Sequence, residues 1–411
     1  MEKKQKEKVI KAYKGFDDNL QCRGLQYEVG KEYEMDGDVS CCRNGFHACQ
    51  SPLEVLDYYL LSGDGKMARF CEVEQAGTID KEDDGRSTKV ASSKIKINRE
   101  LTFSELIRLG VEWIKEQVKS KKSKDSKLSD NGERQAKIVS SDNYVNIASS
   151  GYNAQIGSSG YGVKIGSSGS DAKITSSGYN AKIGSSGKYA YIGSNCDAAK
   201  IGSSGNYAKI GSSGNAAKIG SIGDAAKIGS SGDNAKIGSN GDYAKIGSSG
   251  NAAKIGSIGD YAKIGSNGDC AKIGNSGYGA NIASNGNYAN IASSGDRAQI
   301  ASSGYDAQIC SSGPGAKIGS SGKYAKIASS GIFAKIMSTG KDSLICCLGY
   351  NSIAKAKKGS WITLTEWEWV KDEKKKHLVP KCVKTEYVDG ERIKSDTWYK
   401  LVNGEFTEVE A

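Results

Sequence analysis

The sequence predicts a mainly β protein, built around a long β-solenoid of nonapeptide repeats with a small domain on each side. Three observations support this fold class. An isoleucine falls on every ninth residue from Ile138 to Ile345, 24 times in succession, without insertion or deletion. Two glycines in every nine residues would cost a helix roughly 2 kcal/mol per repeat. Alanine takes the glycine place in every third triplet, which the crowded axis of a collagen helix does not admit.

The repeat and the changes of composition beside it divide the chain into four parts. We expect an α+β domain at residues 1–118, a basic serine-rich linker at 119–135, the solenoid at 136–351, and a tryptophan-rich β-hairpin cap at 352–411. Both ends of a solenoid need covering, because an open coil exposes a sheet edge that pairs with other chains.

The first part is expected to mix strands and helices. Lys11–Phe16 and Gly24–Tyr33 are predicted as strands or sheet edges, and Arg69–Glu74 alternates like a strand. A helix is predicted at Ser51–Tyr59, where a Ser-Pro pair supplies the N-cap and the first turn. A second helix, with a Ser or Thr cap and Glu in its first turn, is expected from residue 102 to about 118.

Each nonapeptide is predicted to give one short strand and one corner. Ala208, Lys209 and Ile210 alternate between small inward, charged outward and branched inward residues, which is the period of a half-buried strand. Gly211 and Gly214 bracket a serine pair, and we expect them to permit the tight backbone, often with positive φ, that reverses the chain. Isoleucines of facing sheets would then meet in the middle of the coil.

Two nonapeptides would make an 18-residue, two-sided coil, so the 24 repeats would give twelve coils. A three-sided coil of 27 residues is the second choice. Burying one isoleucine stabilises the fold by roughly 1.5–3 kcal/mol, and ordering nine residues costs about as much or more. Each coil therefore depends on stacking against its neighbours.

The last part is predicted to be a small β cap. Residues 360–369 form a strand with Ile362 and Leu364 on one face, and two hairpins follow, with two-residue turns at Asp389-Gly390 and Asn403-Gly404. An aromatic protein-binding patch is the alternative to a purely structural role, because tryptophan is enriched at binding hot spots. The candidates are Trp361, Trp367, Trp369 and Trp398.

The solenoid carries most of the formal charge of +10. Residues 136–345 contain 19 Lys and one Arg against 11 Asp and no Glu, and 16 of these lysines occupy the outward position before the repeat Ile, nearly always after Ala. We expect ladders of lysine on both flat faces, one roughly every 4.8 Å. They either keep the faces soluble and apart or bind nucleic acid, another polyanion or an acidic partner. The candidates are Lys200, Lys209, Lys218, Lys227, Lys236, Lys245, Lys254, Lys263 and Lys272.

No metal ion or cofactor is predicted. The Gly-Gly-x-Gly-x-Asp pattern of calcium-binding nonapeptide rolls is missing. Residues of the kind that bind zinc gather in the first domain without a Cys-x-x-Cys pair, so buried thiols are the favoured interpretation. Cys–His nucleophilic catalysis by two of them on one strand face is a further alternative. They are Cys22, Cys41, Cys42, His47, Cys49 and Cys71.

Composition also indicates a compartment. No apolar run approaches 18 residues, so no transmembrane helix is expected, and the charged N-terminus lacks the apolar core of a signal peptide. The eleven Cys are irregularly spaced, which favours free thiols over a disulfide framework. We therefore predict a cytoplasmic protein without a membrane partner.

Both ends of the chain carry strings that support a resemblance. At the N-terminus they are Lys14-Gly15-Phe16, Cys22–Lys31, Cys41, Gly45–Cys49, Pro52 and Tyr58-Tyr59, and at the C-terminus Thr397–Tyr399 and Asn403–Phe406. Together with the repeats, they resemble an uncharacterised family of bacterial and phage-encoded proteins, in which a domain of unknown function is often followed by short glycine-rich repeats. This resemblance implies a phage or mobile-element context and no established activity.

A second similarity bears on the first domain alone. Gly45-Phe46-His47, the Ser-Pro helix and Glu72-Val73-Glu74 are similar to elements of ADP-ribosyltransferase-type folds, which bind NAD around them. The similarity implies a nucleotide- or NAD-handling enzyme as an alternative, whereas a role as structural strand residues explains the same pattern without chemistry.

The function predicted from these patterns is non-enzymatic binding. The repeat leaves few places for a catalytic pocket, and no catalytic triad or phosphate loop is present. We expect an interaction protein that binds, and in a phage context inhibits, a host protein or nucleoprotein complex, with nucleic acid as a further partner. The alternatives are the nucleotide-handling enzyme and a structural assembly component that oligomerises through its end domains.

Overall fold

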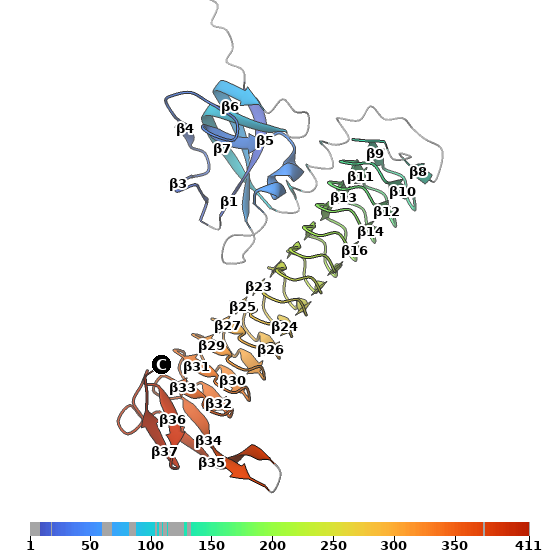
Figure 1. Cartoon of the computed structure of the whole chain (residues 1–411). Coiled ribbons are helices and arrows are strands. Elements are labelled where there is room, and N and C mark those ends of the chain that lie inside the picture. Colours follow the sequence, from blue (N-terminus) through green and yellow to red (C-terminus); the bar gives the residue numbers. More distant parts are fainter. Residues whose placement is uncertain are drawn as a thin grey trace, which may run out of the picture. The chain divides into compact units, whose positions relative to one another are not determined.

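The computed structural model describes residues 9–17, 19–59, 68–81, 88–102, 105, 106, 109, 113, 127–129, 133–372 and 375–410. The chain has two compact units, residues 1–232 and 233–411, and each contains part of the repeat region (Figure 1).

The N-terminal part of the first unit is a small antiparallel β domain. Its sheet has the order β4-β7-β5-β1-β6, and because β6 also pairs with β7, four of the strands close on themselves. The closed sheet buries a core around Phe16, Val73, Ile95 and Ile97. The elements are β1 (Ile10–Phe16), β2 (Gln21–Cys22), β3 (Leu25–Gln26), β4 (Glu32–Glu34), β5 (Phe46–Cys49), the 3-10 helix η1 (Pro52–Asp57), β6 (Arg69–Lys81) and β7 (Lys89–Leu101).

The predicted strands of this domain are found at β1 and β6, but its helices differ from the prediction. The segment after Ser51 forms the 3-10 helix η1 instead of an α-helix, and Ser51 makes no side-chain cap hydrogen bond. The side chain of Glu54 is tied to Thr88 instead, by bonds of 2.8 and 2.9 Å from the Thr88 backbone N. The predicted α-helix at this segment is therefore wrong, and the described residues from 9 to 101 form strands, turns and the short η1.

Most of the second predicted helix lies outside the described residues. Thr102 and Glu105 form the reciprocal hydrogen bonds of a capping box, with N–O distances of 2.9 and 3.2 Å. Positions 105, 106, 109 and 113 are helical. The predicted start of this helix therefore agrees with the structure.

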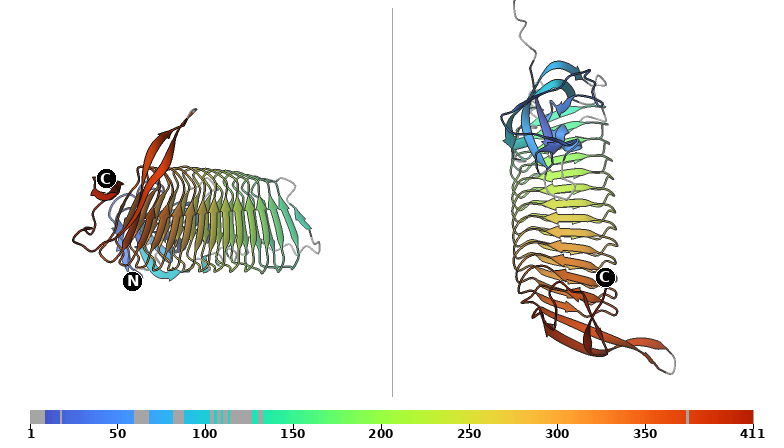
Figure 2. Two further views of the ribbon diagram at one scale, coloured as in Figure 1. Left: turned by 90° about the horizontal axis from the view of Figure 1, so that it is seen from below. Right: turned by 90° about the vertical axis from the view of Figure 1, so that its left-hand side faces the viewer.

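The nonapeptide region forms the predicted two-sided β-solenoid, of about 13 turns (Figure 2). Each strand pairs in parallel with the strand 18 residues later, as Ile147 with Ile165 in the first unit and Ile237 with Ile255 in the second. Even-numbered strands form one sheet and odd-numbered strands the other. This register confirms the 18-residue coil and excludes the 27-residue alternative.

The strands of the first unit's coils are short and evenly spaced. They are β8 (Lys127–Ser129), β9 (Lys137–Ser140), β10 (Asn146–Ser149), β11 (Gln155–Ser158), β12 (Lys164–Ser167), β13 (Lys173–Ser176), β14 (Lys182–Ser185), β15 (Tyr191–Ser194), β16 (Lys200–Ser203), β17 (Lys209–Ser212), β18 (Lys218–Ser221) and β19 (Lys227–Ser230).

The second unit continues the same pattern. Its solenoid strands are β20 (Lys236–Ser239), β21 (Lys245–Ser248), β22 (Lys254–Ser257), β23 (Lys263–Ser266), β24 (Lys272–Asn275), β25 (Asn281–Ser284), β26 (Asn290–Ser293), β27 (Gln299–Ser302), β28 (Gln308–Ser311), β29 (Lys317–Ser320), β30 (Lys326–Ser329), β31 (Lys335–Ser338), β32 (Leu344–Cys347) and β33 (Ile353–Lys355).

The interior of the coils is built from alanine and isoleucine, as predicted. Ala208 and Ile210 are completely buried in the first unit, and Ala253 and Ile255 are 0% and 3% exposed in the second. Isoleucine lies directly on isoleucine in the neighbouring coil because the parallel register places identical repeat positions side by side. Stacked burial of this kind supplies the stabilisation that a single coil lacks.

The repeat glycines have a different role from the one predicted. The strand glycine points outward, and a Cβ on Gly220 or Gly256 would meet nothing within 4 Å. The corner glycine lies against the backbone of the preceding coil, where a Cβ on Gly259 would lie 2.2 Å from the carbonyl oxygen of Gly241. The corner thus needs glycine for close approach, and neither repeat glycine has the positive φ that we expected.

Positive φ occurs two residues after the corner glycine instead. This position is αL whatever its side chain, with φ of 61° at Tyr207, 55° at Ala216 and 57° at Tyr243. Non-glycine residues rarely adopt this region. The backbone N–H of Tyr207 donates to the carbonyl oxygen of Asp224 in the next coil at 2.8 Å, and the same bond recurs along the corners, so stacking offsets the local strain.

Asp and Asn at the corners connect one coil to the next. The Oδ1 atom of Asp242 accepts a hydrogen bond from the backbone N of Asp260 at 2.8 Å, and Oδ1 of Asp260 accepts one from Tyr278 at 2.8 Å. Asp197 makes the same contact to Asn215 at 2.7 Å in the first unit. These side chains therefore satisfy backbone donors that the turn leaves without a partner.

The C-terminal cap extends both sheets of the second unit. Its strands are β34 (Trp361–Lys371), β35 (Lys376–Tyr387), β36 (Tyr399–Val402) and β37 (Glu405–Glu408). Strand β34 lies parallel to β32 and antiparallel to β35, and it buries Ile362 and Leu364 as predicted. Lysines and Pro380 on β35 make that edge a poor partner for another strand.

One of the two predicted turns of the cap is found. Asn403 and Gly404 have φ of 50° and 73° and join β36 to β37, as predicted. The prediction of a two-residue turn at Asp389-Gly390 is wrong. Oδ1 of Asp389 accepts hydrogen bonds from the backbone N of Glu391 and of Ile393, at 2.8 and 3.0 Å, and the chain forms a wider loop there. The hairpin that follows β34 is instead formed with β35, and the backbone N of Asp372 donates to the carbonyl oxygen of Lys375 at 3.0 Å.

Candidate functional site

The lysine candidates do not form one surface, because the two-sided coil divides them between facing sheets. Successive repeats alternate between even-numbered and odd-numbered strands. Even-numbered strands carry Lys200, Lys218, Lys236, Lys254 and Lys272, and odd-numbered strands carry Lys209, Lys227, Lys245 and Lys263.

The even-numbered strands of the second unit present what we call the lysine face, formed by Lys236, Lys254 and Lys272. All three side chains are exposed, and none forms an ion pair with another described residue. They occupy directly paired positions, so neighbouring ammonium stems start about 4.8 Å apart. The equivalent lysines of the first unit, Lys200 and Lys218, are exposed as well.

Glycine lies beside each lysine of this face. Gly238, Gly256 and Gly274 occupy the second outward position, and a Cβ on any of them would meet nothing within 4 Å. The lysine face therefore consists of a row of like charges next to a strip of bare backbone. Such a surface is flat and accessible to an extended partner.

The odd-numbered strands present their lysines differently. Lys209 and Lys227 are half-buried. The ammonium of Lys209 lies 4.7 Å from the centre of the Tyr191 ring and 3.2 Å from its hydroxyl oxygen. Lys245 and Lys263 are exposed, and their row ends at Asn281 as the even row ends at Asn290. The even-numbered strands are the stronger candidates for a binding surface because all five of their candidate lysines are exposed.

The four tryptophan candidates do not form a single patch. Trp361 and Trp369, on β34, are 47% and 60% exposed. Trp367 is half-buried and donates from its indole nitrogen to the carbonyl oxygen of Leu348 at 2.8 Å. Trp398 directly precedes β36 of the other sheet, and the ammonium of Lys355 lies 5.1 Å from the centre of its ring. Of the four tryptophans, only Trp361 and Trp369 are exposed enough to contact a partner.

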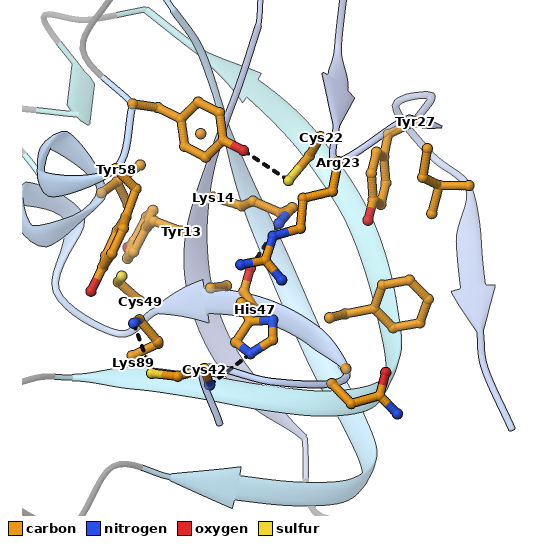
Figure 3. Close-up of a pocket in the computed structure, with 18 of the residues that line it drawn as sticks. Tyr13, Lys14, Cys22, Arg23, Tyr27, Cys42, His47, Cys49, Tyr58 and Lys89 are labelled. Carbon is orange, nitrogen blue, oxygen red and sulfur yellow. Dashed lines mark hydrogen bonds between the residues drawn. The ribbon is translucent and has the colours of Figure 1, made fainter. Parts of the chain in front are cut away.

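A further site, of which sequence reasoning named Cys22, Cys42, His47 and Cys49 as candidates but none of the cations, lies in the N-terminal domain. Residues of β1, β5, the β2–β3 turn and the start of β7 surround a pocket of about 770 Å³ (Figure 3). Four cationic side chains line it, Lys14, Arg23, Arg43 and Lys89, against one carboxylate, Glu34. Glu34 is already paired with Lys94 outside the pocket, at 3.2 Å.

Lys14 is the most unusual residue of the pocket. It is 6% exposed, and its ammonium donates to the carbonyl oxygen of His47 at 2.9 Å. It forms no ion pair with any described acidic residue, and burial lowers the pKa of its ammonium. The sequence signal was a lysine inside the run Ala12–Phe16, whose other members are apolar or glycine and are buried.

His47 faces the same space from β5. Its Nε2 accepts a hydrogen bond from the backbone N of Cys42 at 3.0 Å, which fixes the orientation of the ring. Burial lowers its pKa, and the nearby charges of Lys14, Arg23 and Lys89 add to this effect. This lowered pKa favours the neutral form of the His47 ring.

Tyrosines form the walls of the pocket. The hydroxyl of Tyr59 is 2.9 Å from the sulfur of Cys22, and the Lys89 ammonium lies 4.5 Å from the ring centre of Tyr58. Tyr13 and Tyr27 complete this group. Burial is the main cause that raises the pKa of both Tyr27 and Tyr59.

The cysteines of this domain are distributed around the pocket rather than gathered. The Lys89 ammonium lies 3.1 Å from the Cys42 sulfur, whereas Cys71 is buried in the core. Within the described residues, no three His, Cys, Asp or Glu side chains are grouped in a way that could hold a metal ion. All eleven cysteines are free thiols.

Residues 10–109 match a family model described as Domain of unknown function (DUF7666). This match covers the closed β domain and its pocket and leaves the solenoid and the cap outside. No curated protein and no solved structure shows significant similarity to the chain. In the part of the chain that the structure describes, no helix is both long and apolar enough to cross a membrane.

Proposed function

We propose that the chain is a non-enzymatic binding protein, encoded by a phage or another mobile element, whose lysine face holds an anionic surface of a host protein or nucleoprotein complex. The observation that carries this proposal is the row of Lys236, Lys254 and Lys272, exposed and without ion pairs among the described residues. Like charges in register repel one another, and a partner that brings negative charge relieves this repulsion.

The geometry of the face supports an extended partner. Its lysines repeat about every 4.8 Å in one line, and the glycine strip beside them leaves room for a chain to lie flat. Association of this kind is electrostatic and independent of sequence, as in phosphate-backbone recognition. It suits a protein that blocks a surface rather than one that transforms a substrate.

The test uses fluorescence anisotropy of the full chain with a labelled single-stranded RNA and with a labelled polyglutamate peptide, each over a range of salt concentrations. The variant is Lys236→Gln/Lys254→Gln/Lys272→Gln. The matched control, Lys317→Gln/Lys335→Gln/Lys341→Gln, removes the same charge from other surfaces of the second unit.

We expect the wild-type chain to bind with a steep salt dependence, and the lysine-face variant to reduce the slope by about 2, at roughly 0.7 per phosphate contact on a single strand. The control variant should keep most of the wild-type slope. Equal losses in the two variants, or no binding of either probe at low salt, would show that the lysines only keep the faces soluble.

The exposed tryptophans of β34 offer a second kind of contact with the same partner. Trp361 packs at a tilt against Tyr387 with ring centres 5.1 Å apart, and Trp369 is more than half exposed. Large exposed aromatic side chains are typical of binding hot spots. A host protein captured from cells in a salt-insensitive way, and lost with Trp369→Ala but not with the lysine-face variant, would assign the main contact to the cap.

A further inference from the structure

The pocket of the N-terminal domain contains an unusual buried charge. Lys14 is on the central strand β1, is 6% exposed and has no acidic partner among the described residues. A buried cation without a counter-charge is costly, and proteins that retain one use it for binding or chemistry. The ammonium donates to the carbonyl oxygen of His47 and also faces the Cys22 thiol and the rings of Phe16 and Tyr27. None of these groups is a carboxylate, so the ammonium can still donate to an anionic ligand.

A second cation reaches the same point. Figure 3 shows the side chain of Arg23 directed toward Lys14 from the β2–β3 turn, whereas the ring of His47 is turned toward Cys42. Arg23 has a φ of 52°, a strained value for arginine that sets the direction of its side chain. Lys14 and Arg23 line the same part of the pocket, and two cations held near each other repel. This arrangement costs free energy unless an anion lies between them.

The size and the lining residues of the pocket indicate which kind of molecule carries the anionic group. A volume of about 770 Å³ exceeds the need of an inorganic anion and is typical of sites for small organic molecules. Tyr13, Tyr27, Tyr58 and Tyr59 all line it. Aromatic rings stack on planar ligands, whereas the cations recognise oxygens of phosphate.

We propose that this pocket binds a small organic phosphate, with the phosphate between Lys14 and Arg23 and a planar ring against the tyrosines. The inference is independent of the lysine face, because the two surfaces share no residue. It assigns binding and no reaction to the domain of unknown function.

The experiment is isothermal titration calorimetry of the full chain with three probes: AMP, which has both ring and phosphate, inorganic pyrophosphate, which has only the charge, and adenosine, which has only the ring. We expect AMP to bind most tightly, pyrophosphate more weakly and adenosine most weakly. Absence of binding by both phosphate probes at millimolar concentration would overturn the proposal, as would adenosine binding as tightly as AMP.

Three variants locate the site. Lys14→Met should weaken AMP binding by at least about tenfold, the effect of losing a charge-assisted hydrogen bond, and Arg23→Gln should weaken it as well. The control is Lys11→Met, on the same strand but exposed and paired with Glu72 at 3.2 Å, which should leave affinity within about twofold. An equal loss with the control would place the ligand elsewhere.

Stability separates binding from a structural role. If the charge of Lys14 has no counter-charge until an anion binds, Lys14→Met removes an uncompensated buried charge. The ligand-free variant should then have a melting temperature no lower than that of the wild type. A lower melting temperature, together with unchanged AMP affinity, would show that Lys14 only supports the strand that carries His47, and would refute the proposed site.

Discussion

Alanine at Gly259 and alanine at Gly256 should have opposite effects on the stability of one coil. These glycines are three residues apart, but a Cβ on Gly259 would lie 2.2 Å from the carbonyl oxygen of Gly241, whereas a Cβ on Gly256 would meet nothing within 4 Å. The two substitutions therefore add the same methyl group to a closed contact and to an open surface.

The cost of Gly259→Ala follows from the movement it requires. Real Cβ atoms are essentially never found closer than 3.0 Å to such a neighbour, so the corner must open by about 0.8 Å against backbone that cannot rotate away. Overpacking of this kind costs about 1–3 kcal/mol. The adjacent hydrogen bond from Asp260 N to Asp242 Oδ1, now 2.8 Å, would stretch beyond bonding range and add about 1 kcal/mol.

Gly256→Ala should instead stabilise the coil by about 0.4–1 kcal/mol, because alanine reduces the entropy of the unfolded chain. Hydrogen–deuterium exchange of the amides in residues 237–266 measures both effects locally, and thermal melting by circular dichroism measures their consequence for the whole chain. Local measurement matters because repeat proteins do not always unfold in one step.

Equal exchange rates and melting temperatures for the two variants would refute the steric argument. The sequence itself limits how large the cost of a corner side chain can be. From residue 151 to residue 349 the corner position is glycine in every repeat except one, where Cys196 is found. Cys196 is buried there, with its sulfur 3.1 Å from the Ser176 hydroxyl oxygen. One coil thus adapts to a side chain, and Gly259→Ala should weaken the protein without preventing its folding.

Three further changes test other features of the structure. Asp260→Ala should cost the second unit about 1 kcal/mol, because the backbone N of Tyr278 loses its acceptor at 2.8 Å, whereas Asp260→Asn should retain most of the stability in a denaturant titration; equal losses would contradict the role of Oδ1. Burial raises the pKa of Cys71 and of Cys347 to about 12, so at pH 8 neither should react with iodoacetamide while the exposed Cys270 and Cys310 do, as read by mass spectrometry. The hydrogen bond from Arg392 holds the pKa of Glu386 below its usual range. The pair therefore stabilises the cap fully above the ordinary carboxyl pKa, and this stabilisation is lost as pH falls through the lowered pKa. Glu386→Gln should make the stability of the cap fall less steeply at acidic pH, and an unchanged fall would exclude this pair as its cause.

The solenoid could be predicted because its information is local and repeated. Alternation within Ala208–Ile210 defined the strand, and the uniform spacing of isoleucine limited the coil to a few sizes. The role of glycine could not be read in the same way, because close approach and positive φ both select glycine. Only the fold shows that the αL position carries residues as large as Tyr243, held by a hydrogen bond to the next coil.

The pocket was beyond sequence reasoning for a different reason. Lys14, Arg23 and His47 come from three separate elements, and their meeting depends on how β1, β5 and the β2–β3 turn lie in the closed sheet. The local signals were Lys14 inside the buried run Ala12–Phe16 and the nearby ligand-type residues His47, Cys22, Cys42 and Cys49, which do not by themselves indicate a cationic pocket. The helix at Ser51 was wrong because Glu54, which suits a first helical turn, is held by Thr88 instead.

The pairing of strands 18 residues apart restricts how the length of such a protein can change. A gain or loss of two repeats adds or removes one complete turn and returns every later strand to its own sheet. A single repeat would transfer all later strands to the opposite sheet, so that the segment after β32 would meet the wrong neighbour for the cap. Variation in length should therefore proceed in pairs of repeats, and an odd change would require the end of the protein to be rebuilt.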